Sequence, residues 1–244
     1  MKHIPNTITL INLFLGCVAM VMTFQGQPGV AAVIIGLCAL LDFLDGAVAR
    51  MLGAGSPIGQ QLDSLADLVS FGVAPAAILF FYLQEGFQKI QPEHPHILLP
   101  SLAFLVAVFS GLRLARFNID DEQQNDFRGL PTPASALLIA SIPFVLTYTD
   151  PHNLVFRQLE ALTTNVWFIL GLTLVISWLL VSPVRMFSLK VKSFAWKDNR
   201  YVYVFLAGCL LLLVIFGLPG VPLFLIFYLL LSLVYHIQHN ITES

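Results

Sequence analysis

Four closely spaced aspartates are the side chains of this sequence best suited to chemistry: Asp42, Asp45, Asp63 and Asp67. The first two are three residues apart and the last two are four apart. Either spacing places both side chains of a pair on one face of an α-helix. Carboxylates gathered in apolar surroundings stay ionised only with cations between them. Oxygen-only ligation suits Mg²⁺ or Mn²⁺, so the pattern predicts a divalent metal centre.

Small residues lie beside these acids. Gly46 and Ala49 follow the first pair on or near the same helical face, and Gly59 precedes Asp63 by one turn. A missing side chain lets a ligand reach the backbone. Because protein-bound Mg²⁺ is usually shared between a few carboxylates and substrate phosphates, we expect a phosphate-bearing substrate at this centre. The intervening segment contains Gly53, Gly55 and Pro57 and should turn the chain, so that two antiparallel helices present the acids to each other.

Two other interpretations of the acids stay open at this point. They could be solvated carboxylates at helix ends, or they could line the ion pathway of a divalent-cation transporter. A pathway needs acids spread across the bilayer. Here they cluster at one end, and the predicted outer loops contribute only Glu85, Glu93, Asp150 and Glu160.

The elements that position the acids must be membrane helices. Of the 244 residues, 57% are hydrophobic and 11% are charged, against roughly 25% charged in a soluble domain. The composition therefore predicts an all-α polytopic membrane protein. A net charge of −2 argues against a nucleic-acid partner, which would require concentrated positive charge.

Eight apolar segments are long enough to be membrane spans. They are 7–24, 29–47, 63–83, 97–117, 133–149, 165–182, 201–217 and 220–237. No change of composition marks a second domain, so residues 1–244 are predicted to form a single transmembrane domain.

The basic residues predict the orientation of these spans. Ten of the twelve Lys and Arg fall on the side that holds both termini and residues 42–67, and only Lys89 and Arg157 fall on the other. Positive loops are cytoplasmic as a rule. We therefore expect an inner (cytoplasmic) membrane protein with both termini and the acidic site on the cytoplasmic face.

The acids and small residues together spell D-x-x-D-G-x-x-A-R-x8-G-x3-D-x3-D, from Asp42 to Asp67. This pattern resembles the signature of the CDP-alcohol phosphatidyltransferase family. The first predicted span opens with Pro5, Asn6 and Thr9, which resemble the P-N-x-x-T motif of the same family.

The resemblance implies a six-helix core, usually in a homodimer, that moves a phosphatidyl group from CDP-diacylglycerol to an alcohol and releases CMP. It implies that Asp42, Asp45 and Asp63, completed by Asp67, hold the metal, two divalent ions in all. Asp67 would also be the base acting on the acceptor hydroxyl. The CDP-lipid pocket would be formed by seven residues: Asn6, Thr9, Asp42, Gly46, Ala49, Arg50 and Gly59.

Later segments resemble the phosphatidylserine synthase branch of this family. They are GLRLARFN at 111–118, FRGLPTPAS at 127–135 and, more loosely, VSPVRMFSLK at 181–190. They favour L-serine as the acceptor, with glycerol phosphate or an inositol compound as the alternative. Since a guanidinium matches a carboxylate, we predict an acceptor site at Arg113, Arg116 and Asn118. Arg185 and Lys190 are candidates for binding lipid phosphates, and the alternative role for them is to set the topology.

Overall fold

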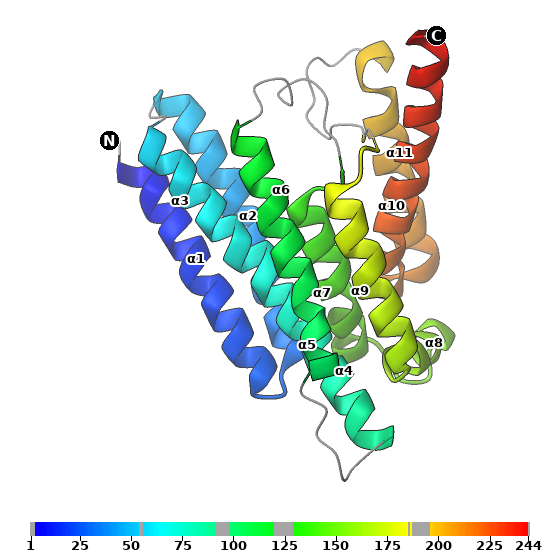
Figure 1. Ribbon diagram of the computed structural model, residues 1–244. Helices are drawn as coiled ribbons and strands as arrows, with labels where there is room; N and C mark the ends of the chain where they lie inside the picture. The colour runs from blue at the N-terminus through cyan, green and yellow to red at the C-terminus, as the bar shows by residue number, and fades with distance from the viewer. Residues whose placement is uncertain are drawn as a thin grey trace.

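The computed structural model describes residues 3–53, 56–90, 98–119, 129–184, 186 and 196–243, and every regular element in these ranges is a helix (Figure 1). Helix α1 (His3–Phe24) packs along α2 (Pro28–Leu52). Helix α3 (Pro57–Asp67) returns alongside α1. The predicted antiparallel helix pair is therefore present, with residues 42 and 45 on α2 and residues 63 and 67 on α3.

Local chemistry explains where α2 ends and α3 begins. Gly53 has a φ of 56°, a left-handed conformation that glycine adopts without strain, and its N–H bonds to the last carbonyls of α2. The hydroxyl of Ser56 accepts a hydrogen bond of 3.1 Å from the Gly59 N–H, and Pro57 occupies the first turn of α3. Because these caps fix the first turn of α3, Asp63 falls within the helix and Asp67 is its last residue.

A π-helical segment, η1 (Leu68–Val73), follows α3 directly and continues into α4 (Ala74–Ile90). Two glycines let the neighbouring helices approach η1 closely. A Cβ on Gly16 of α1 would meet the Ser70 Oγ at 2.6 Å, and a Cβ on Gly72 would meet the Ser110 Cβ at 3.1 Å. The segment after Asp67 is therefore held tightly between two neighbouring helices.

The remaining helices complete the bundle. They are α5 (Leu98–Ser101), the 3-10 turn η2 (Leu102–Phe104), α6 (Leu105–Ile119), α7 (Thr132–Tyr148), α8 (Leu154–Thr163), α9 (Val166–Val181), α10 (Trp196–Phe216), the 3-10 turn η4 (Leu218–Gly220) and α11 (Val221–Glu243). Helix α2 packs on α7, and α6 packs on α9. Helices α10 and α11 pair with each other at one flank of the bundle, as Figure 1 shows in orange and red.

All eight predicted spans coincide with helices. In the described part of the chain, six helical stretches are long and apolar enough to cross a membrane. Helix α9 qualifies only together with α8, to which it is bent by 87°, and α7 is a shorter apolar helix. The count of eight crossings thus remains a prediction that depends on α7 and α9. The sequence prediction did not include α8, because its ten residues mix polar and apolar side chains.

Several segments that are far apart in the sequence lie at the same end of the bundle. Figure 1 shows that this end holds the start of α1, the turn between α2 and α3, the end of α6 and the end of α11. This arrangement agrees with an even number of crossings. The side of the membrane that this end faces remains a prediction from the Lys and Arg distribution.

Candidate active site

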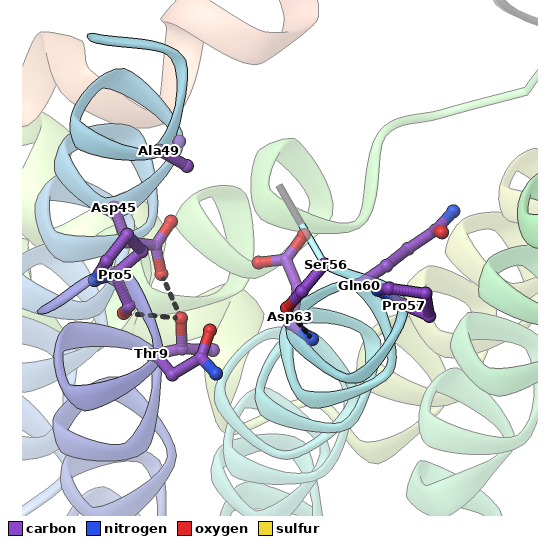
Figure 2. A pocket seen from close by; sticks show the side chains of 11 residues that line it. Pro5, Thr9, Asp45, Ala49, Ser56, Pro57, Gln60 and Asp63 are labelled. Carbon is purple, nitrogen blue, oxygen red and sulfur yellow. Dashed lines mark hydrogen bonds between the residues drawn. The ribbon is translucent and has the colours of Figure 1, made fainter. Parts of the chain in front are cut away.

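A cavity of about 470 Å³ opens between α1, α2 and α3 near the turn that joins the last two (Figure 2). Eleven residues line it: Pro5, Asn6, Thr9, Asp45, Gly46, Ala49, Ser56, Pro57, Gly59, Gln60 and Asp63. In Figure 2, Asp45 on α2 and Asp63 on α3 lie on opposite sides with their carboxylates turned toward the space between the helices. The cavity therefore combines acidic groups with small residues and polar amides.

Thr9 holds Asp45 at the wall of this cavity. Its hydroxyl lies 2.7 Å from the Asp45 Oδ2 and 3.0 Å from the Pro5 carbonyl oxygen. Both side chains of the Thr9–Asp45 pair are only 5% exposed. A carboxylate buried to this extent requires a hydrogen-bond donor, and Thr9 supplies one from the neighbouring helix.

Three of the four predicted metal ligands converge. Asp42, Asp63 and Asp67 each offer a carboxylate oxygen, and these oxygens lie within 4.8 Å of one another. Asp67 Oδ1 is buried and has no hydrogen-bond partner among the described residues. A buried acceptor without a partner is unfavourable, and a cation shared by the three oxygens would satisfy it. The donor set therefore fits a hard divalent ion.

Asp45 is not part of that convergent group, which we call the carboxylate trio (Asp42, Asp63 and Asp67). It faces the same cavity as Asp63 but is bonded to Thr9. Its predicted role as a metal ligand remains a prediction.

Glycines shape the cavity between the helices. A Cβ on Gly59 would lie 3.0 Å from both the Asn6 Oδ1 and the Ser56 Oγ. A Cβ on Gly46 would lie 3.5 Å from the Arg50 Nη1, so the Arg50 side chain folds back along α2 toward the cavity. Side chains larger than hydrogen at these positions would intrude on the space that a ligand needs.

Five of the seven residues predicted for the CDP-lipid pocket line the cavity: Asn6, Thr9, Gly46, Ala49 and Gly59. Of the other two, Asp42 belongs to the carboxylate trio and Arg50 lies beside Gly46. The sequence prediction missed Ser56 and Gln60. The Ser-Pro pair is a typical helix start, and Gln60 precedes Asp63 by three residues on the same helix, so both signals were available.

The predicted acceptor residues lie on α6, which runs antiparallel to α3 and η1. The amide nitrogen of Asn118 donates to the Ser64 Oγ at 2.8 Å, and a Cβ on Gly111 would meet the Leu68 side chain at 3.5 Å. Arg113 lies between these two contacts along α6 and is thus at the height of the last acid of α3.

Arg113 is half-buried, and its Nε is buried without a hydrogen-bond partner among the described residues. Its charge is close enough to interact with that of Asp67. Arg116 is exposed, one turn further along α6. The candidates for lipid-phosphate binding, Arg185 and Lys190, lie outside the described residues. The structure therefore puts Arg113 close to Asp67 of the convergent acids. The Arg113 Nε and the Asp67 Oδ1 both lack a hydrogen-bond partner among the described residues.

Comparison with known proteins gives a consistent result. Residues 2–237 match the family described as CDP-alcohol phosphatidyltransferase. The chain is 33% identical to a CDP-diacylglycerol–serine O-phosphatidyltransferase of Helicobacter pylori, over 83% of this chain and 79% of the relative. It is 32% identical to the Mycobacterium leprae protein of the same name, over 99% of this chain and 75% of that protein. An archaetidylserine synthase of Methanothermobacter thermautotrophicus is 36% identical over 60% of each chain.

Proposed function

The chain belongs to the CDP-alcohol phosphatidyltransferase family, and we propose that it transfers the phosphatidyl group of CDP-diacylglycerol to the hydroxyl of L-serine. The products are phosphatidylserine and CMP. The observation that carries the proposal is the position of Arg113 close to Asp67 of the carboxylate trio, which shares Asp63 with the cavity proposed for the nucleotide. The serine-specific names of the relatives support the choice of acceptor.

The cavity between α1, α2 and α3 is the proposed site for the CDP headgroup. Asn6 and Gln60 offer amide groups that can hydrogen-bond a pyrimidine or a ribose. Arg50 beside Gly46 can pair with a phosphate oxygen. The absence of side chains at Gly46 and Gly59 leaves space for the pyrophosphate next to the acids.

The carboxylate trio would hold a divalent metal, Mg²⁺ or Mn²⁺, and Asp45 would contribute to a second ion. When bound, such ions neutralise the pyrophosphate and stabilise charge on the attacking and leaving oxygens. The chain's own part is to fix the carboxylates: α2 carries Asp42, and the caps of α3 set the position of Asp63 and Asp67.

Asp67 is the proposed base. Its Oδ1 is buried, without a donor among the described residues, and close to Arg113. Serine would place its carboxylate on the Arg113 guanidinium and its hydroxyl toward Asp67. As Asp67 accepts the hydroxyl proton, the serine oxygen forms a bond to the phosphorus that bears the diacylglycerol. The bond from that phosphorus to the CMP oxygen breaks, and CMP leaves with the electron pair.

The protein is an integral membrane protein, with several helices that are long and apolar enough to cross the bilayer. We propose that the active site faces the cytoplasm across the inner membrane, where a soluble amino acid and a nucleotide headgroup can reach it. Ten of the twelve Lys and Arg residues are predicted to lie on the side of the membrane that holds both termini, and this distribution supports the orientation. We also propose a homodimer, as the family resemblance implies.

The purified full chain, supplied with CDP-diacylglycerol and Mg²⁺, should release CMP when L-serine is added. Release only with glycerol phosphate or an inositol compound would overturn the serine assignment. Excess chelator should stop the reaction, and Mg²⁺ or Mn²⁺ should restore it; full activity in chelator would refute the metal assignment. Divalent-cation flux into proteoliposomes without any CMP release would instead indicate a transporter.

A further inference from the structure

Asn12 is a buried polar residue of α1 whose side chain has no assigned role. It is 1% exposed, and its Oδ1 is buried without a hydrogen-bond partner among the described residues. Its backbone carbonyl, by contrast, accepts hydrogen bonds from the Ser70 hydroxyl at 3.1 Å and the Cys38 thiol at 3.6 Å. Buried side-chain oxygens are rarely left without a partner, so this one calls for a ligand or another function.

The contacts of α1 with α2 place Asn12 within about one helical turn of the height of Asp42. Thr9 meets Asp45, and the Asn12 carbonyl meets Cys38, so the two helices run antiparallel. Asp42 lies between Asp45 and Cys38 along α2. It therefore faces the part of α1 between Thr9 and Asn12.

The contacts of α1 with α3 and η1 place Asn12 at the height of the second acidic pair. Asn6 lies beside Gly59, and Gly16 lies beside Ser70, so these segments run parallel. The two acids of α3 lie between Gly59 and Ser70. They are thus at the level of the α1 segment between Asn6 and Gly16, which contains Asn12.

The Asn12 Oδ1 has no hydrogen-bond donor among the described residues. Asp67 Oδ1 is likewise buried without a partner, so two unsatisfied acceptors lie at the same height in the bundle. Acceptors that share a space are compatible when a cation lies between them. Amide carbonyls are ordinary ligands of hard divalent ions, and a neutral one adds an oxygen without adding negative charge.

We propose that the side-chain carbonyl of Asn12 is a further oxygen ligand of the divalent cation held by the carboxylate trio. The inference rests on the metal centre of the proposed function. It deepens that function by adding a ligand from α1, a helix that contributes none of the four aspartates. The cation would then connect three segments of the bundle: α1, α2 and α3.

The test is Mn²⁺ binding to the metal-stripped full chain in detergent, measured by electron paramagnetic resonance of free Mn²⁺ without substrate. Asn12→Leu removes the oxygen at similar volume and should weaken Mn²⁺ binding about 10- to 100-fold. The same variant should unfold at an equal or higher temperature than the wild type when metal-free, because it removes a buried acceptor that lacks a partner. Wild-type Mn²⁺ affinity in Asn12→Leu would overturn the proposal.

A second variant separates a ligand from a hydrogen-bond donor. Asn12→Asp keeps an oxygen at the same place and should bind Mn²⁺ at least as tightly as the wild type. If the amide nitrogen instead donated to Asp67, Asn12→Asp would introduce repulsion and weaken binding as much as Asn12→Leu, which would refute the ligand role.

The matched control is Thr23→Val. Thr23 is a fully buried residue of α1 whose hydroxyl bonds to the Ala19 carbonyl of its own helix, and its variant should bind Mn²⁺ normally. Serine-dependent CMP release by the wild type is measured in parallel. Its absence would refute the proposed function, whereas normal Mn²⁺ binding by Asn12→Leu in an active preparation would refute only the assignment of this ligand.

Discussion

The side-chain amide of Asn118 donates a hydrogen bond of 2.8 Å to the hydroxyl of Ser64. Ser64 lies between Asp63 and Asp67 on α3, and its hydroxyl also bonds to the Gln60 carbonyl at 3.2 Å. The bond joins residues 54 positions apart and ties the helix that carries Arg113 to the helix that carries two of the carboxylates. We therefore propose that Asn118 positions α3 against α6, in addition to its predicted place in the acceptor site.

We expect Asn118→Ala and Ser64→Ala to lower kcat by similar factors, because each removes the same link between α6 and α3. The double variant should be no worse than either single variant, with a coupling of about 1 kcal/mol. Steady-state kinetics with serine and CDP-diacylglycerol as varied substrates measure this cycle. If Asn118→Ala alone raised the KM for serine and Ser64→Ala left it unchanged, Asn118 would contact serine directly.

Asp67→Asn should abolish most of the turnover while CMP binding stays measurable. The amide keeps the shape of the side chain but cannot accept the hydroxyl proton, so kcat should fall about 10²- to 10⁴-fold. Single-turnover CMP release and CMP binding by calorimetry measure the two properties separately. Asp150→Asn is the control, since Asp150 is exposed and bonds only locally to the His152 N–H. Near-normal kcat in Asp67→Asn would exclude Asp67 as the base.

Thr9→Val should weaken both the fold and the binding of the CDP-lipid. The variant leaves the buried Asp45 carboxylate without its 2.7 Å donor, which should lower the free energy of unfolding by about 1–3 kcal/mol. Denaturant unfolding in detergent measures this change. Thr173→Val is the comparison, because the equally buried Thr173 hydroxyl bonds only to the Ile169 carbonyl of its own helix. An equal decrease in the free energy of unfolding of the two variants would mean that the contact between Thr9 and Asp45 adds no stability beyond that of an ordinary hydroxyl bond within a helix.

Gly59→Ala should raise the KM for CDP-diacylglycerol. Its Cβ would lie 3.0 Å from the Asn6 and Ser56 oxygens, so it narrows the cavity and presses on the cap of α3. We expect about a tenfold increase, equivalent to ~1.4 kcal/mol of binding. Gly36→Ala, where the new Cβ would meet no atom within 4 Å beyond its own stretch of helix, should leave the KM unchanged and stabilise α2 by about 0.5–1 kcal/mol. An unchanged KM in Gly59→Ala would place the headgroup elsewhere.

The sequence by itself predicted the membrane class, the eight helical segments and the helical face that each pair of acids shares. These properties depend on nearby residues: apolar runs of the length of a bilayer make helices, and spacings of three and four place side chains on one face. It missed α8, whose short amphipathic sequence resembles a loop between spans. It also did not predict η1, since nothing in the local residue pattern marks a π-helix.

Only the tertiary structure decided which side chains meet. It brought together Asp42, Asp63 and Asp67 and paired Asp45 with Thr9, although the spacing had grouped all four acids alike. The pattern of residues along one helix specifies a face, but the height and rotation of that face against another helix depend on the packing of both. Close contacts such as that of Gly16 with Ser70 set this relation, and they also brought the unassigned Asn12 to the level of the acids.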